Sequence, residues 1–291
     1  MELPEGRFCF FRHQFTSTRK YDPLWTAYAG QRFLFASSFT HPIEGKLTFR
    51  VVTYMTQAQV TIDVDIKKNA ILRRYMDLPK LLDLLHFQKL YIRRADGFSD
   101  RLEGALFPSL RSSINKVHAE GAALYDADDF HRRARIGSYV SCWTMSGQDS
   151  MALWQLYGGV RNSVAVTTTV DRLVTTSFAW ERSVRLHRVK YVDHSKVKNY
   201  IINSYEDVLQ FKHKAYKHEK ELRILVPQQS DNWESNPISL RLPVPNLDSF
   251  VRSIVVAPEA DNNFFEVIKG LCAKYGLRAP VRRSKLAFVP V

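Results

Sequence analysis

Short segments patterned like β-strands alternate with short segments patterned like amphipathic helices from about residue 70 onward. The clearest helix is predicted at 78–87 (LPKLLDLLHF), where leucines recur on one face and Pro79 falls in the first turn. The predicted strands do not each follow a full-length crossover helix. This order predicts an α+β fold with a mixed, mainly antiparallel sheet flanked by short helices, rather than a doubly wound parallel sheet.

The other elements of this domain follow from the same two periodicities. We expect strands at 89–94, 138–144, 162–169, 185–193, 221–226 and 253–258, and helices within 106–135 and at 150–158, 205–220 and 264–276. Asp126 or Asp128 is expected to cap the helical piece 129–135, and Gly158 and Gly276 to close their helices.

The N-terminal part of the chain has a different pattern. Residues 46–52 (KLTFRVV) and 59–65 (QVTIDVD) alternate apolar and polar side chains with period two, which predicts two strands. We therefore expect residues 1–69 to form a small β-rich extension and residues 70–291 to form the main α+β domain.

A formal net charge of +13 and a pI near 9.7 favour an anionic partner. Nucleic acid is the first expectation, and a phosphorylated small molecule such as a dinucleotide is the second. A solvated basic surface without a partner is the alternative. No segment has the apolar length of a membrane span, and the first residues lack the apolar run of a signal peptide, so we expect a cytoplasmic, soluble protein.

Several common catalytic motifs are absent from the sequence. It contains no glycine-rich phosphate loop, no HExxH and no GxSxG. Cys9, Cys142 and Cys272 lie far apart, without metal-ligand spacing, and are expected to be reduced thiols. No metal is predicted, although scattered carboxylates can assemble a nuclease site that a sequence does not reveal.

Three blocks, in order, resemble a bacterial family of unknown function, the domain of unknown function twenty-nine seventy-one. They are Arg74 and Tyr75 with LYIRRADGF and the following Asp100 and Glu103, then 139–158 (YVSCWTMSGQDSMALWQLYG), then 212–224 (KHKAYKHEKELRI). The resemblance covers about residues 70 to 290. It departs from the family pattern at Ser99, Arg101 and Tyr216, where asparagine, proline and tryptophan are usual.

The order of these blocks is also similar to the layout of ADP-ribosyltransferases, whose α+β core binds NAD without a glycine-rich loop. This resemblance implies NAD as a substrate and a bacterial toxin or phage-defence role, with nucleic acid as an acceptor in view of the charge. An arginine would bind the pyrophosphate, and hydroxyl and aromatic side chains would contact the nicotinamide and ribose. The candidates are Arg74, Arg93 and Arg94, together with Tyr75, Ser141, Trp143, Trp154 and Tyr157.

Two glutamates in the third block are the catalytic candidates. Glu221 would stabilise an oxocarbenium-like centre and Glu219 would orient the acceptor, and both project to one face if this segment is extended. Lys214, Lys217 and Arg223 would bind the anionic substrate. The hypothesis requires Arg74, Ser141 and Glu221 to face one cleft.

Each of these features has a structural alternative. The glutamates could form helix-spaced ion pairs, such as Lys217 with Glu221, and Arg74 could lie on a solvated strand edge. The aromatic residues could belong to the core, Cys142 could be a small buried apolar residue, and Asp100 and Glu103 could form a local charge cluster.

Two other functional classes are consistent with the sequence. One is a basic nucleic-acid-binding protein or metal-dependent nuclease of a defence system, using Asp100, Glu103, Glu219 and Glu221. The other is a non-catalytic regulatory or interaction protein.

Overall fold

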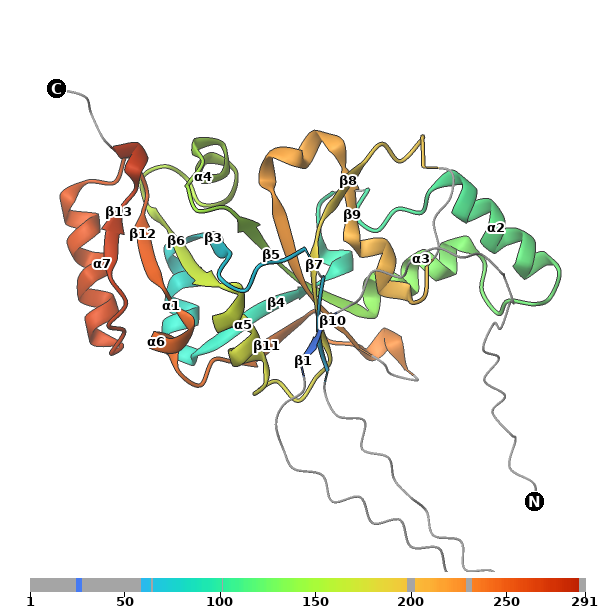
Figure 1. Ribbon diagram of the computed structural model, residues 1–291, viewed down its shortest axis with the longest axis horizontal. Helices are drawn as coiled ribbons and strands as arrows, with labels where there is room; N and C mark the ends of the chain where they lie inside the picture. The colour runs from blue at the N-terminus through green and yellow to red at the C-terminus, as the bar shows by residue number, and fades with distance from the viewer. Residues whose placement is uncertain are drawn as a thin grey trace, which may run out of the picture.

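A large mixed sheet organises the chain in the computed structural model, which describes residues 25–27 (backbone only), 59–63, 65–100, 102–197, 202–228 and 232–287 (Figure 1). The strand order is β1-β2-β7-β10-β5-β3-β6-β12-β13, and β4 and β11 form a branch that joins at β5. All pairings are antiparallel except β12 with β13 and β2 with β7. The predicted mixed, mainly antiparallel α+β fold is confirmed.

The strands of this sheet are short. They are β1 Trp25–Ala27, β2 Val60–Ile62, β3 Ile71–Asp77, β4 Lys89–Arg94, β5 Ser138–Met145, β6 Ser163–Thr169, β7 Val184–Arg188, β10 Glu221–Pro227, β11 Ser239–Pro243, β12 Ser253–Val256 and β13 Val281–Arg283. A separate parallel pair consists of β8 Lys190–Val192 and β9 Phe211–His213.

Short helices flank the sheet. They are α1 Leu78–Phe87, α2 Pro108–Ala119, α3 Ala127–Ile136, α4 Met151–Tyr157, α5 Val170–Ser177, α6 Leu247–Phe250 and α7 Asn262–Lys274, with 3₁₀ turns η1 Ala95–Gly97, η2 Tyr205–Gln210, η3 Lys214–Glu219, η4 Trp233–Ser235 and η5 Lys285–Ala287. In Figure 1, α7 lies beside β12 and β13 at one end of the molecule, and α2 lies at the other.

The local signals placed most helices correctly. In α1, Asp77 caps the N-terminus by accepting a hydrogen bond from the Lys80 amide, and the buried leucines face the core. Asp126 caps α3 by accepting from the amides of Asp128 and Asp129, and Gly158 ends α4.

One predicted helical region is divided, and one predicted helix is wrong. The stretch 106–135 forms two helices, α2 and α3, separated by a turn at residues 120–126. The stretch 205–220 forms η2, β9 and η3 instead of one helix. Residues 207–212 are all buried, and six consecutive positions cover every side of a helix rather than one face.

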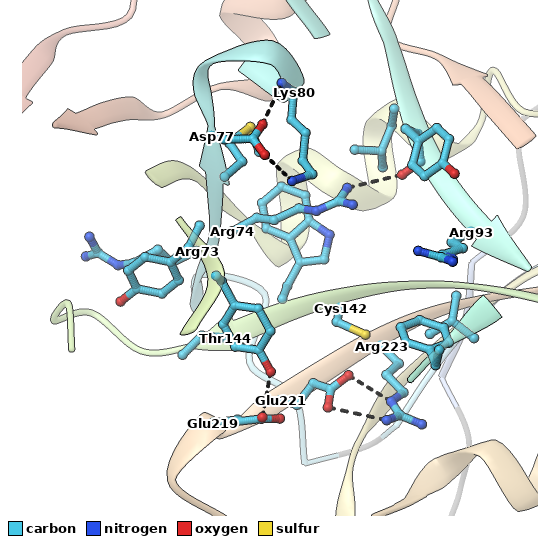
Figure 2. Close-up of a pocket in the computed structure, with 18 of the residues that line it drawn as sticks. Arg73, Arg74, Asp77, Lys80, Arg93, Cys142, Thr144, Glu219, Glu221 and Arg223 are labelled. Carbon is cyan, nitrogen blue, oxygen red and sulfur yellow. Dashed lines mark hydrogen bonds and ion pairs between the residues drawn. The ribbon is translucent and has the colours of Figure 1, made fainter. Parts of the chain in front are cut away.

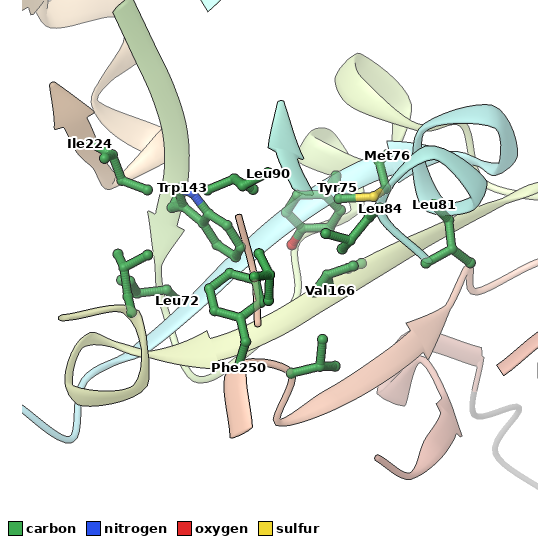
Figure 3. Close-up of a cluster of buried hydrophobic side chains, with 14 of the residues drawn as sticks. Leu72, Tyr75, Met76, Leu81, Leu84, Leu90, Trp143, Val166, Ile224 and Phe250 are labelled. Atoms are coloured by element: carbon green, nitrogen blue, oxygen red, sulfur yellow. The ribbon is translucent and has the colours of Figure 1, made fainter. Parts of the chain in front are cut away.

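The main core contains three of the four aromatic residues predicted for the site, Tyr75, Trp143 and Trp154. Trp143 and Trp154 are almost completely buried. Trp143 packs edge-on against Phe250 (Figure 3), with 6.0 Å between the ring centroids. Tyr75 packs edge-on against Trp154, with 4.8 Å between the ring centroids. Trp143 and Trp154 therefore act mainly in packing, as the structural alternative proposed.

The described end of the predicted N-terminal extension joins the large sheet. β2 pairs with β7, and Val60 and Ile62 are buried in the main core. The predicted strand 46–52 lies outside the described residues, and the division at residue 69 stays a prediction. Within the described part of the chain, the helices are all too short or too polar to cross a bilayer.

Strand β5 has different neighbours along one of its edges. Its first part pairs with β4 through Tyr139 and Val140, and its last part pairs with β3 through Thr144 and Met145. No strand among the described residues pairs with positions 141–143 on that edge, whereas β10 pairs with β5 along the whole opposite edge. The sheet therefore opens between β3 and β4.

Candidate functional site

A cavity of about 870 Å³ occupies the opening between β3 and β4. Its lining comes from β3, α1, β4, residues 98–100 and 103, the middle of β5, the end of α4, β9, η3, the start of β10, and β11. Figure 2 shows Arg74 on one side and Glu221 with Arg223 on the other, with Cys142 between them. Side chains from segments more than 140 residues apart in sequence thus line one volume.

Arg223 organises the floor of this cavity from the middle of β10. It is 1% exposed and donates to both oxygens of Glu103, to both oxygens of Glu221 (2.8 and 3.4 Å) and to the carbonyl of Leu209. These bonds use all five N–H groups of a guanidinium. The prediction that Arg223 binds an anionic substrate is therefore wrong, because no donor remains for one.

Lys212 joins a third carboxylate to this group. Its Nζ lies 2.5 Å from Glu219 Oε2 and 3.3 Å from Glu221 Oε2, and the hydroxyl of Tyr157 donates to Glu219 Oε1 at 2.6 Å. Glu219 and Glu221 do converge, but not as neighbours on one extended segment. Lys220 between them has a left-handed backbone (φ 47°) that separates η3 from β10.

The buried network holds Glu221 in its ionised form. Burial alone would raise the pKa of Glu221, but the charges of Arg223 and Lys212 and the hydrogen bond from Arg223 outweigh it and lower the pKa to about 2. Glu103, Glu219 and Glu221 are three carboxylates against two cations, Arg223 and Lys212. The floor therefore carries surplus negative charge when all five are ionised.

The opposite wall of the cavity is basic. Arg74 is half-buried and donates one hydrogen bond to the carbonyl of Tyr91 at 3.2 Å. Lys89 and Arg93 are exposed, and neither has a hydrogen-bond or ion-pair partner among the described residues. Donors on this wall are thus available to phosphate oxygens, unlike those of Arg223.

Cys142 lies between the two walls. Burial, followed by the nearby charge of Glu221, raises the pKa of its thiol well above the usual range. A thiol in this state is a poor nucleophile, and the structural alternative for Cys142 is the better supported one.

The cavity contains part of the predicted site. The predicted residues that line it are Arg74, Tyr75, Arg93, Trp143, Tyr157, Glu219, Glu221 and Arg223. Tyr157 is 48% exposed, so it is not a core residue. Tyr75 contributes to the lining while its hydroxyl accepts from the Ser150 amide at 3.0 Å.

Five predicted site residues lie outside the cavity lining. Ser141 is buried and accepts a hydrogen bond from Trp143 Nε1 at 3.1 Å. Arg74 and Glu221 line one cavity but Ser141 does not, so the arrangement that the ADP-ribosyltransferase hypothesis required is only partly present. Its neighbours Cys142 and Thr144 face the cavity instead. Trp154 belongs to the core.

The other three are basic residues. Arg94 forms an ion pair with Asp96 and donates to the carbonyl of Asn236. Lys214 pairs with Asp193 at 2.9 Å outside the cavity. Lys217 is exposed, and the ion pair expected with Glu221 is formed by Lys212 instead.

Sequence reasoning missed the role of Lys212 and the partnership of Glu103 with Arg223. Nothing in the local sequence marks Lys212 as a side chain that is only 9% exposed. No group of three or more histidine, cysteine, aspartate or glutamate side chains among the described residues is placed to hold a metal ion.

Comparisons with known proteins give only a distant likeness. No family model matches the chain, and no curated protein matches it. The structure is similar to that of Thermus sp. 2.9 DarT in complex with NAD⁺, with a TM-score of 0.39 and 9% identity over 77% of this chain and 100% of that chain. DarT in complex with ADP-ribosylated ssDNA gives 0.37 and 10% identity over 76% and 97%. At such TM-scores the likeness does not establish a function for this chain.

Proposed function

We propose that this protein transfers ADP-ribose from NAD, with Glu221 as the catalytic residue. The observation that carries the proposal is the charge distribution of the cavity: surplus negative charge at the floor and free cationic donors on the facing wall. NAD has the complementary distribution, because its nicotinamide ring is cationic and its pyrophosphate is anionic. The volume of about 870 Å³ is in the range of small-molecule sites.

The proposed chemistry assigns one role to each side of the cavity. Arg74 binds the pyrophosphate through the guanidinium donors that Tyr91 leaves free. When the bond between the ribose and nicotinamide breaks, its electron pair leaves with the nicotinamide, and positive charge develops on the ribose. The Glu221 carboxylate, which stays ionised at neutral pH, stabilises that charge until an acceptor attacks the ribose and releases a proton.

The acceptor we favour is nucleic acid. Lys89, Tyr91 and Arg93 alternate along β4 with their side chains exposed, and Arg241 lies opposite Tyr91 on β11. All four line the cavity, and the Arg241 guanidinium lies over the rings of Phe87 and Tyr91 at 4.8 and 5.9 Å. Cations that bind phosphates beside exposed rings that stack on bases are typical of single-strand binding surfaces.

A toxin or phage-defence role, which the family resemblance implies, agrees with this chemistry. An enzyme that consumes NAD or modifies nucleic acid would arrest growth of the cell that contains it. The family resemblance, and not the geometry of the cavity, supports this part of the proposal.

The first experiment compares the wild type with Glu221→Gln. Purified protein is incubated with NAD and with single-stranded DNA, RNA or protein, and both nicotinamide release and acceptor modification are measured. We expect Glu221→Gln to lose at least 100-fold in kcat while still binding NAD. Glu206→Gln is the matched control, because Glu206 pairs with Arg185 and does not line the cavity. Wild-type rates in Glu221→Gln would exclude Glu221 as the catalytic residue.

The second experiment tests the acceptor surface. The double variant Lys89→Ala with Arg93→Ala should bind a single-stranded oligonucleotide less tightly in fluorescence anisotropy and show a shallower salt dependence, by about 0.7 in the log–log slope per lost phosphate contact. Lys217→Ala is the control, since Lys217 is exposed and outside the cavity. Equal slopes for all three proteins would argue against this surface.

A metal-dependent nuclease is less well supported. Glu103, Glu219 and Glu221 do gather as that alternative requires, but Lys212 and Arg223 lie among them and occupy their oxygens. Nucleic-acid cleavage that requires a divalent metal and is indifferent to NAD would favour the nuclease. A non-catalytic partner would show neither turnover nor any effect of Glu221→Gln.

A further inference from the structure

Glu103 lies buried at the floor of the cavity, and the chemistry proposed above uses it only as one of the three carboxylates of that floor. It is 2% exposed, and residues 98–100 before it in the chain also line the cavity. Its amide donates to the carbonyl of Asp100 at 3.1 Å, and the next residue, Gly104, has φ +70°. A Cβ at Gly104 would lie 2.9 Å from Leu209 Cδ2, so the chain is tightly fixed at the point where Glu103 turns inward.

The Glu103 carboxylate meets the guanidinium of Arg223 edge to edge. Arg223 NH2 lies 2.9 Å from Glu103 Oε2, and NH1 donates to Oε1. The remaining edge of the same guanidinium, with Nε, faces the Glu221 carboxylate. A planar guanidinium with one edge fixed has little freedom at the other.

We propose that Glu103 is a positioning residue that, through Arg223, fixes the orientation and the negative charge of the Glu221 carboxylate. The inference rests on the proposed function and deepens it. Without the Glu103 charge, Arg223 would pair with Glu221 alone and neutralise more of the charge that stabilises the transition state. Binding of NAD by Arg74 and the basic wall would be largely unaffected.

Protonation of Glu103 should therefore control the fall of kcat at acid pH, which is the acid limb of the pH profile. Burial raises the pKa of Glu103 more than Arg223 lowers it, whereas the pKa of Glu221 is about 2. As the pH falls, Glu103 gains its proton before Glu221 does. The charged and titratable groups that face Glu103 are Arg223 and Glu221 on β10, Lys212 on β9 and Cys142 on β5, and His131 on α3 contacts its backbone.

The test is the pH profile of kcat for the wild type, Glu103→Gln, Glu103→Asp and the control Glu206→Gln, with NAD affinity measured by calorimetry. We expect Glu103→Gln to lower kcat about 10-fold to 100-fold, as for the outer partners of catalytic groups. Its Kd for NAD should stay within about threefold, and its acid limb should disappear. Glu103→Asp keeps the charge and should recover part of kcat and the acid limb.

The other outcomes refute the inference in distinguishable ways. Wild-type kcat and an unchanged acid limb in Glu103→Gln would show that Glu103 does not act on Glu221. A parallel loss of kcat, NAD affinity and thermal stability in both Glu103 variants would show a purely structural role. A wild type that does not cleave NAD at all would refute the proposed function, and the inference with it.

Discussion

Replacing Lys212 by methionine tests how much the buried network contributes to stability. The drop in the pKa of Glu221 from 4.5 to about 2 corresponds to about 3 kcal/mol in favour of the ionised carboxylate. Lys212 and Arg223 share this effect, and Lys212 is also the partner of Glu219. Removing one member of a buried ion pair costs about 3 to 5 kcal/mol. We therefore expect Lys212→Met to lower the free energy of unfolding by about 3 kcal/mol at pH 7.

The pH dependence of this loss has a defined sign. A carboxyl whose folded pKa is lowered stabilises the fold above its unfolded pKa, and the stabilisation disappears as the pH falls through the folded value. In Lys212→Met, Glu221 keeps Arg223, so its pKa should rise only part of the way toward 4.5. The stability difference from the wild type should persist down to that value and disappear as the pH approaches 2.

Urea unfolding followed by the fluorescence of the buried tryptophans measures both quantities. Lys214→Met is the control, because the exposed pair of Lys214 with Asp193 is screened by solvent and should contribute little to stability. If Lys212→Met and Lys214→Met lose the same small amount at pH 7, Lys212 does not stabilise the buried carboxylates. A loss that does not shrink at acid pH would mean that lost packing, not charge, is the cause.

Three further tests compare side chains that line the cavity with side chains that do not, or remove a hydrogen bond at its edge. Arg74→Ala should raise the Kd for NAD about 10-fold to 100-fold through lost charge-assisted hydrogen bonds, measured by calorimetry, while Arg94→Ala should leave it unchanged. Ser141→Ala should leave the Kd within about twofold and Thr144→Ala should raise it, because only the threonine faces the cavity; the reverse order would contradict the assignment. Tyr157→Phe should lower the free energy of unfolding by about 1 kcal/mol through its lost hydrogen bond, and unchanged urea midpoints would argue against that bond.

The local signals of the sequence were enough for most helices and strands. The spacing of leucines in α1 and the cap at Asp126 depend only on near neighbours in the chain. The stretch 205–220 was mispredicted because its helix-forming charged residues matched a helix, while burial against the sheet and the second strand pair determined its structure.

The site was only partly predictable, for two physical reasons. Facing alternates along a strand, so the difference between Ser141 and Cys142 depends on the register of β5, which a single sequence does not specify. The pairing of Glu103 with Arg223 joins residues 120 positions apart, and no local pattern records it. Arg74 and Glu221 could be named because their types suit the chemistry, whereas their meeting depends on the opening of the sheet.

Because of that opening, three parts of the sheet share β5 as their common strand. The part that includes β10 carries Glu221, and the part that includes β3 carries Arg74. The part formed by β4 and β11 carries Arg93. The distance between the acidic floor and the basic wall of the cavity thus depends on how these three parts of the sheet twist around β5. A ligand that contacts Arg74 and Glu221 together would link the β3 part and the β10 part of the sheet across β5. Its binding energy would then add to the stability of the folded chain, so a tightly bound inhibitor would also stabilise the fold.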